Sequence, residues 1–137
     1  MSLSVKDIWL KTVSTQVEND WNLICFPFLC GFAEYFLSWQ RLLPDSRLYA
    51  IQLPGHGSRK QETHITHIDN LLDRLLPALL PTLEEKPYVL FGHSMGGYLA
   101  YRTARKLQEL KFNAPLLLVV SGTSGPCLLY TSDAADE

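Results

Sequence analysis

Residues 87–110 read PYVLFGHSMGGYLAYRTARKLQEL, and this stretch decides the fold of the chain. Its opening residues, 87–92, form an apolar run that is typical of a buried strand. Residues 95–110 repeat apolar side chains with the spacing of an amphipathic helix. A turn rich in glycine, 92–96, joins the two segments directly. The sequence therefore predicts a strand, a tight turn and a helix in immediate succession.

The rest of the chain alternates between the same two patterns. Further strands are predicted at 22–27, 47–52 and 114–121. Helices are predicted over 33–43, which Pro44 closes, and over 68–83, where leucines recur on one face. Strands that alternate with helices form parallel sheets with helices on both faces, and unbroken apolar strands fit that burial. The expected fold is an α/β domain whose mostly parallel sheet has about four strands.

The helix over 68–83 carries two further signals. Thr66 followed by Asp69 resembles a capping box, which predicts the start of the helix. Pro77 and Pro81 interrupt the pattern, but both fall on the polar face, where the carbonyl groups that they free can reach water. A kink or a break is therefore expected at the prolines, within an element that persists.

Residues 92–96, GHSMG, match the pattern G-x-S-x-G, and their position gives the pattern its meaning. Between a buried strand and a helix, the serine lies on a strained turn that lifts its hydroxyl out of the sheet. Side chains at Gly92 and Gly96 would collide within that turn. The helix that follows begins with free N–H groups, which favour a developing oxyanion. Ser94 is therefore predicted to be a nucleophile, and the alternative is a glycine-rich turn with an incidental serine.

A serine nucleophile needs a histidine base and a carboxylate that orients the base. On this kind of strand–turn–helix unit both partners follow the serine in the chain. The four histidines are His56, His64, His67 and His93, so none follows Ser94. His93 is expected to point away from Ser94 in the turn. The chain as it stands is therefore expected to be inactive, or nearly so.

Composition excludes several classes of protein. With 47% hydrophobic and 19% charged residues, the 137-residue chain is typical of one globular domain. A net charge of −2 without a basic run argues against nucleic-acid binding. No apolar stretch approaches the roughly 18 residues that a membrane span needs. Residues 1–20 carry several charges and no signal-peptide core, so a cytoplasmic location is expected.

Metal binding and disulfide bonds are not expected either. His64 and His67 lie close together without a third ligand nearby, and two solvated histidines explain them. The cysteines Cys25, Cys30 and Cys127 are an odd and sparse set in a chain without a secretion signal, which indicates free thiols.

The end of the chain differs in character from the rest. Residues 127–137 read CLLYTSDAADE, a string that resembles the translation of a transposase adapter used in preparing sequencing libraries. On this interpretation the tail carries no function and the natural sequence ends at Pro126. A genuine polar tail is the alternative. The expected organisation is one domain over 1–126 and a non-native tail over 127–137.

Three segments together resemble the type II thioesterases, which are stand-alone enzymes that serve fatty acid, polyketide and nonribosomal peptide synthases. They are LICFPF at 23–28, LPG at 53–55 and FGHSMG at 91–96. The resemblance extends over residues 20–124 and implies the N-terminal part of an α/β-hydrolase fold. It also implies that later strands, a lid and the catalytic aspartate and histidine lie outside this chain.

The resemblance implies a reaction and a partner as well. Ser94 would attack the thioester of an acyl chain on the phosphopantetheine arm of an acyl carrier protein, and water would then release a fatty acid from the acyl-enzyme. Backbone N–H groups of Met95 and Phe28 would form the oxyanion hole, with Leu29 as the alternative to Phe28. No cofactor is implied, because phosphopantetheine belongs to the substrate, and the complete enzyme is expected to be a monomer.

Two details of the resemblance leave alternatives open. The basic residues Arg59, Lys60, Arg102 and Arg105 are candidates for contact with an acidic carrier protein, although ordinary surface charge explains them as well. Residues 29–31 read LCG where the family usually has AGG, and this bulk would narrow the oxyanion loop or alter acyl choice. Cys30 is most simply a small side chain in a glycine position.

Two other functions compete with the thioesterase. One is a different α/β-hydrolase, such as a lipase or carboxylesterase. The other is a non-catalytic product, either a binding module or a chain without function. In the isolated chain an unpaired sheet edge and uncovered apolar helix faces would promote aggregation, so poor solubility or partial order is expected.

Overall fold

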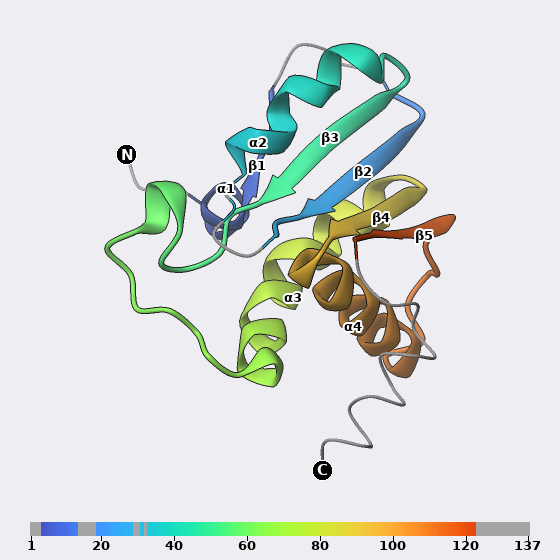
Figure 1. Ribbon diagram of the computed structural model, residues 1–137. Helices are drawn as coiled ribbons and strands as arrows, with labels where there is room; N and C mark the ends of the chain where they lie inside the picture. The colour runs from blue at the N-terminus through green and yellow to red at the C-terminus, as the bar shows by residue number, and fades with distance from the viewer. Residues whose placement is uncertain (1–3, 14–18, 29–30, 32, 123–137) are drawn as a thin grey trace.

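The computed structural model describes residues 4–13, 19–28, 31 and 33–122, which form a five-stranded sheet with helices on both faces (Figure 1). The strands are β1 (Leu10–Lys11), β2 (Trp21–Phe26), β3 (Ser46–Ile51), β4 (Tyr88–His93) and β5 (Leu117–Ser121). The helices are α1 (Val5–Trp9), α2 (Glu34–Leu37), α3 (Ile68–Glu85) and α4 (Met95–Glu109), with the 3-10 helices η1 (Ser38–Leu42) and η2 (Gly57–Arg59). The strand order is β1-β3-β2-β4-β5, and every pair is parallel except β1 with β3. The mostly parallel sheet is confirmed, and β1 is a strand that the sequence pattern does not reveal.

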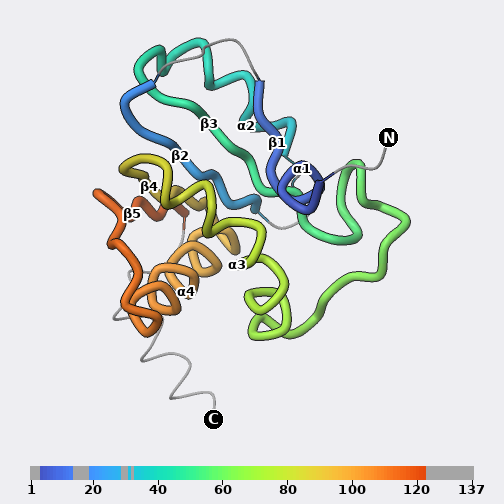
Figure 2. Tube along the Cα trace, turned by 180° about the vertical axis from the view of Figure 1, so that it is seen from behind, coloured from blue at the N-terminus to red at the C-terminus, as the bar shows by residue number. Residues whose placement is uncertain are grey.

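Helices cover both faces of the sheet, α2 and η1 on one face and α1, α3 and α4 on the other (Figure 2). Successive residues of β2 point to opposite faces. Cys25 lies in the smaller core cluster with Phe36. Its neighbour Ile24 lies in the larger cluster with Leu75. Burial from both sides explains why β2 reads as an unbroken apolar run.

Helix α3 runs without interruption from Ile68 to Glu85, so the break considered at the prolines does not occur. Pro77 and Pro81 are both exposed. Water can therefore satisfy the carbonyl groups that lack an N–H partner, as the polar face of the helix predicts.

The capping box predicted from Thr66 and Asp69 is wrong. His67 is the N-cap residue of α3, and its side chain makes no capping hydrogen bond. The Asp69 carboxylate instead pairs with the Arg102 guanidinium on α4, at 2.6 Å. The Asp69 carboxylate therefore joins two helices instead of capping its own, and a local sequence pattern does not reveal such a contact.

The helix predicted over 33–43 is the short helix α2 followed by η1. The Gln40 side chain explains where the segment ends. Its Nε2 donates to the carbonyl groups of Leu43 at 3.2 Å and Ser46 at 2.8 Å. Its Oε1 accepts the N–H of Leu48 at 2.7 Å. These bonds fasten the end of η1 to the start of β3.

Strand β5 is less buried than the other parallel strands. The run 114–121 predicts burial on both faces, but Leu116 and Leu117 are 66% and 57% exposed. Among the described residues β5 pairs only with β4, so it forms an edge of the sheet. The expected burial is therefore wrong for this strand, and its apolar edge favours association.

The Cys25 thiol is fully buried in β2 and is not in a disulfide bond, whereas Cys30 and Cys127 lie outside the described residues. Burial raises the pKa of Cys25 to about 12, and an unfolded thiol has a pKa of about 8.5. Because the folded-state pKa is the higher one, the contribution of this thiol to stability is full below about pH 8.5 and falls as the pH rises towards 12.

We therefore expect Cys25 to reduce the free energy of unfolding by about 1.4 kcal/mol per pH unit above pH 9 or so. Urea unfolding of the parent chain and of Cys25→Ala measures this slope. Burial also raises the pKa of Tyr88 to about 12, so both chains lose stability in alkali and only the difference reports the thiol. Equal slopes in the two chains would contradict the assignment.

Candidate active site

The sheet changes its direction of growth between β2 and β4. From β2 the chain crosses to β3 on one side, and it returns through α3 to β4 on the other side. In open α/β sheets, ligands bind at the carboxyl ends of strands at such a switch point. Phe26 at the end of β2 pairs with Gly92 near the end of β4, so the loops that follow both strands meet there.

Ser94 occupies the turn between β4 and α4. Its backbone has φ 56° and ψ −122°, a conformation that non-glycine residues avoid and that stores strain. The Ser94 N–H donates to the carbonyl of Ser121 at the end of β5, at 2.7 Å, and the Gly97 N–H donates to the Ser94 carbonyl at 2.9 Å. Ser94 is half-buried. The fold thus holds this serine in a strained turn at the switch point.

The two glycines of the turn lie where no side chain fits. A Cβ on Gly92 would be 2.0 Å from the carbonyl oxygen of Gly96. A Cβ on Gly96 would be 2.3 Å from the carbonyl oxygen of Phe26 and 2.6 Å from that of Pro27. All three contacts are with backbone atoms, which cannot rotate away. Gly92 therefore lets the turn close, and Gly96 lets the loop after β2 lie against the start of α4.

The loop after β2 brings Phe28 to the turn. The Phe28 ring packs edge-on against His93, with 6.1 Å between the ring centroids, and against Tyr35 of α2 at 5.0 Å. The Gly31 N–H donates to the Phe28 carbonyl at 2.8 Å. Phe28 therefore lies between the turn that holds Ser94 and the helix on the opposite face.

The start of α4 lies on the other side of this loop. Met95 is the first residue of the helix, so its N–H has no carbonyl partner within the helix and lies at the positive end of the helix dipole. The loop and the helix start, which touch at Gly96, are the segments that carry the predicted oxyanion donors, Phe28 and Met95. Leu29, the alternative donor, lies outside the described residues.

The His93 ring lies against the end of β5. Its Nδ1 is 3.2 Å from Ser121 Oγ, and a Cβ on Gly122 would come within 2.5 Å of the ring. In the described part of the chain no hydrogen bond joins a histidine to Ser94. None of these contacts therefore positions His93 as a base for Ser94.

An apolar pocket of about 360 Å³ lies beside Met95. Its lining residues come from the loop after β3, from residues 64–66 with the first turn of α3, and from the first turns of α4. Apolar side chains form most of its wall, among them Leu53, Ile65, Ile68, Leu71 and Leu99. The volume falls in the usual range of ligand pockets. The sequence patterns do not predict this pocket, because its walls come from three separate segments.

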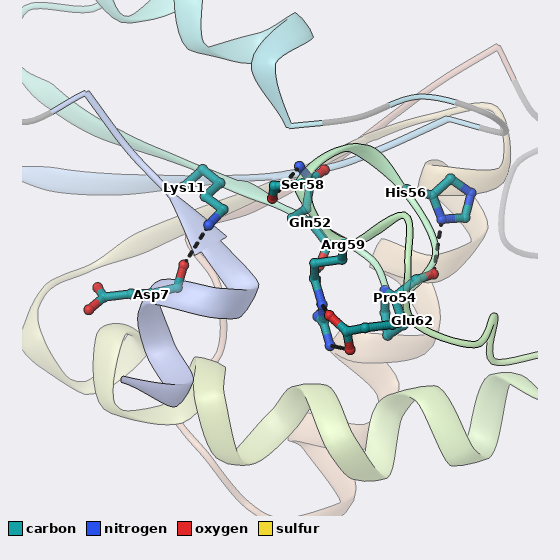
Figure 3. A network of polar contacts seen from close by, with 8 residues as sticks. All are labelled: Asp7, Lys11, Gln52, Pro54, His56, Ser58, Arg59 and Glu62. Carbon is teal, nitrogen blue, oxygen red and sulfur yellow. Dashed lines mark hydrogen bonds and ion pairs between the residues drawn. The ribbon is translucent and has the colours of Figure 1, made fainter. Parts of the chain in front are cut away.

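A buried amide holds the loop after β3 in place (Figure 3). Gln52 follows β3 and is fully buried. Its Oε1 accepts the N–H of Ala33 at 2.9 Å, and its Nε2 donates to Ser58 Oγ at 3.2 Å. One side chain therefore fastens the end of the loop that carries Phe28 to the loop that borders the pocket. The sequence contains one signal of this contact. Gln52 is a polar residue at the end of an apolar strand, directly before the Leu-Pro-Gly segment at 53–55.

Arg59 also holds the loop after β3 in place (Figure 3), and this residue is only 6% exposed. Its Nη1 donates to the Gln52 carbonyl at 3.0 Å. Its Nε and Nη2 donate to the two carboxylate oxygens of Glu62 at 2.6 and 2.8 Å, which lowers the pKa of Glu62. The guanidinium also lies over the Trp9 ring, 4.2 Å from its centroid. The predicted contact between Arg59 and a carrier protein is therefore wrong, because the Arg59 side chain is buried and bonded within the domain.

The other basic candidates differ from Arg59 in their exposure. Arg102 pairs with Asp69 and donates to the Tyr98 hydroxyl at 3.0 Å. Lys60 and Arg105 are exposed. These positions remain compatible both with a carrier-protein contact and with ordinary surface charge.

We expect Gln52→Leu to reduce the free energy of unfolding by about 1–3 kcal/mol, because it leaves the buried Ala33 N–H without an acceptor. Urea unfolding checks this value. Gln61→Leu is the matched control, since Gln61 is exposed and the same change there is expected to have an effect below about 0.5 kcal/mol. Equal losses in the two variants would contradict the role of the amide.

Among the residues that the structure describes, no cluster of histidine, cysteine or acidic side chains has the arrangement of a metal site. Within those residues, none of the helices combines the length and the apolar composition of a membrane span.

Two solved structures share the fold of this chain. The chain superposes on the type II thioesterase BorB from the borrelidin biosynthetic cluster with a TM-score of 0.74 and 32% identity, covering 82% of this chain and 48% of BorB. It superposes on the RedJ thioesterase of the prodiginine pathway in Streptomyces coelicolor with a TM-score of 0.72 and 33% identity, covering 85% of this chain and 46% of RedJ. The sheet, its flanking helices and the turn at Ser94 are those of an α/β-hydrolase, as the sequence predicts.

The family follows from the sequence comparisons. A family model described as "Thioesterase domain" matches residues 22–135. The medium-chain S-acyl fatty acid synthase thioesterase of Homo sapiens is 38% identical over 108 residues, which are 78% of this chain and 41% of that protein. The chain belongs to the thioesterase domain family. It spans less than half the length of the human protein, BorB and RedJ.

Proposed function

We propose that the chain is part of a serine thioesterase that hydrolyses acyl chains from the phosphopantetheine arm of an acyl carrier protein. The observation that carries this proposal is the strained backbone of Ser94, held at the switch point between two glycines that admit no side chain. Strain of this kind persists where the surrounding structure enforces it, and it is concentrated at functional sites. Membership of the thioesterase family supports the choice of substrate.

The chemistry follows from the position of Ser94. A base takes the proton of the Ser94 hydroxyl while Oγ attacks the thioester carbonyl. The N–H groups of Met95 and Phe28 stabilise the oxyanion of the tetrahedral intermediate. The C–S bond then breaks, and the thiol leaves with the proton. Water attacks the acyl-enzyme in the same way, which releases the acid and restores the serine.

The names of two relatives support the choice of a carrier protein as partner. The human relative is named as a thioesterase of fatty acid synthase, and BorB belongs to the borrelidin biosynthetic cluster. Both names fit a carrier-protein partner, which our proposal includes. The proposal also keeps the expectations of no cofactor of the enzyme's own, a monomeric complete enzyme and a cytoplasmic location. A non-native tail over 127–137 remains part of the same proposal.

Thioester cleavage in the presence of imidazole tests the function. All four histidines lie before Ser94, so imidazole in solution supplies the base. We expect release of decanoate from decanoyl-pantetheine to increase with imidazole concentration, and to increase with pH as more of the imidazole becomes neutral and can act as the base. The Ser94→Ala chain measures the background reaction of imidazole itself.

The same assay separates the competing functions. Preference for the thioester over the matching decanoyl oxygen ester supports a thioesterase. Faster cleavage of the oxygen ester would identify a carboxylesterase or lipase instead. A rate equal to that of Ser94→Ala on both substrates would mean that the chain is not catalytic.

A further inference from the structure

The loop that carries Phe28 is held at its two ends by different parts of the molecule. At its start, two backbone carbonyl groups lie against Gly96 of α4. At its end, Ala33 precedes the first turn of α2, where an N–H has no carbonyl partner within the helix. The Gln52 Oε1 accepts this N–H at 2.9 Å. The path of the loop therefore depends on Gln52 as well as on Gly96.

Phe28 is linked to the end of the loop that Gln52 holds. The Gly31 N–H donates to the Phe28 carbonyl at 2.8 Å, and a Cβ on Gly31 would lie 2.9 Å from the same oxygen. Gly31 lies two residues before Ala33 in the chain. Because this connection is so short, a displacement of Ala33 from Gln52 moves Phe28 as well.

The Gln52 amide is itself fixed in place and in orientation. Its side chain is fully buried, and a Cβ on Gly57 would lie 2.3 Å from Nε2, so η2 packs directly on the amide. Nε2 donates to Ser58 Oγ at 3.2 Å and to the Glu34 carboxylate at 3.4 Å. A reversed amide would turn its NH₂ group towards the Ala33 N–H and its oxygen towards the carboxylate of Glu34. Both would be pairs of like groups, so only the observed orientation offers an acceptor to Ala33.

We propose that Gln52 is a positioning residue for the oxyanion hole, and that its bond to Ala33 keeps the Phe28 N–H beside the Met95 N–H. The inference rests on the proposed function, because it takes both N–H groups to be oxyanion donors. Donors of this kind act only within hydrogen-bond distance of the developing oxyanion, and a displacement of about 1 Å costs on the order of 100-fold in rate. Gln52 therefore acts on the reaction through the loop, without contact with the substrate.

Binding of butylboronic acid, followed by ¹¹B NMR, tests the proposal without turnover. Ser94 Oγ bonds to boron and its proton passes to the buffer, which gives a tetrahedral boronate anion with an oxygen at the place of the oxyanion. Gln52→Met keeps the length of the side chain but offers no acceptor, and it is expected to weaken the boronate about tenfold or more. Gln52→Glu keeps an oxygen that accepts the Ala33 N–H, and its affinity is expected to stay within about threefold of the parent.

The two variants separate positioning from a merely structural role. Gln52→Glu places a second carboxyl group beside Glu34, so it is expected to lose stability in urea while it keeps the acceptor. A loss of boronate affinity that follows stability, rather than the presence of an acceptor at position 52, would overturn the proposal. Gln61→Met, the same change at an exposed position, is expected to leave the affinity unchanged. Should Gln52→Met not fold, as judged by circular dichroism, Gly57→Ala decides, because its Cβ displaces the amide from outside the loop. An unchanged affinity in a folded Gly57→Ala chain would then overturn the proposal.

The amide signal of Phe28 reports the loop directly. Pro27 and Phe28 form the only Pro-Phe pair in the sequence, so labelling with ¹³C-carbonyl proline and ¹⁵N-phenylalanine isolates this one amide. The boronate is expected to shift the signal in the parent and in Gln52→Glu, but not in Gln52→Met. An equal shift in Gln52→Met would mean that the loop keeps its place without the amide, which contradicts the proposal.

The two proposals fail in distinguishable ways. If boronate affinity depends on the acceptor at position 52 but Ser94-dependent thioester cleavage is absent, the positioning role of Gln52 stands and the proposed function fails. If cleavage depends on Ser94 but the boronate binds equally to the parent, Gln52→Met and Gln52→Glu chains, or to none of them, the function stands and the role of Gln52 is wrong.

Discussion

Gly96→Ala is expected to reduce the free energy of unfolding by about 3 kcal/mol or more. Its new methyl group would lie 2.3 Å from the carbonyl oxygen of Phe26 and 2.6 Å from that of Pro27. Both oxygens belong to the backbone where β2 ends, so relief requires the loop to move away from α4. The same movement would separate Phe28 from Met95, the two proposed oxyanion donors.

The sign of the change in unfolding free energy distinguishes a steric clash at Gly96 from the effect of helix propensity. Gly96 is the second residue of α4, and helix propensity alone predicts that alanine stabilises a helix by about 1 kcal/mol over glycine. Denaturant unfolding of the parent chain and of Gly96→Ala distinguishes the two effects. A gain in stability would mean that the loop does not lie against the helix as described. Gly92→Ala, which brings a Cβ to 2.0 Å from the Gly96 carbonyl oxygen, is expected to show a similar loss.

Ser94→Ala is expected to reduce imidazole-dependent cleavage of decanoyl-pantetheine by at least about 100-fold, because it removes the nucleophile and leaves only binding and oxyanion stabilisation. Initial rates at several imidazole concentrations measure the effect. The parent chain and Ser94→Ala are expected to unfold at similar denaturant concentrations, since alanine keeps the strained backbone. A slope on imidazole that survives in Ser94→Ala would show that another group reacts.

Ser94→Gly separates strain from chemistry. Glycine adopts a positive φ without the cost that serine pays, so this variant is expected to be more stable than the parent by about 1 kcal/mol while equally inactive. Stability equal to that of Ser94→Ala would mean that the turn at Ser94 is not strained. The comparison thus tests the geometry of the turn independently of the reaction.

The sequence predicts those strands, helices and turns whose signals lie within one short segment of the chain. The strand before Ser94, the turn and α4 follow from an apolar run, two glycines and a helical period within residues 87–110. Strands β2 and β3 are predicted to within about a residue at each end, because both are buried on two faces and carry four consecutive apolar residues, at 23–26 and 48–51.

Contacts between distant segments explain what the patterns miss. Asp69 pairs with Arg102 on another helix rather than capping its own. Arg59 looks like surface charge in the sequence, but it is buried against Trp9, a residue 50 positions earlier. Neither of these outcomes depends on neighbours in the sequence, so a local pattern cannot predict them.

The position of the acyl group on the protein tests whether Ser94 is the nucleophile. The chain is incubated with decanoyl-pantetheine and imidazole, quenched in acid and digested, and the modified peptide is sequenced by mass spectrometry. The assignment of Ser94 as the nucleophile predicts a decanoyl ester on Ser94 that is absent from the Ser94→Ala chain. Decanoylation of a cysteine or lysine instead, or an unmodified Ser94 while Ser94-dependent cleavage proceeds, would contradict it.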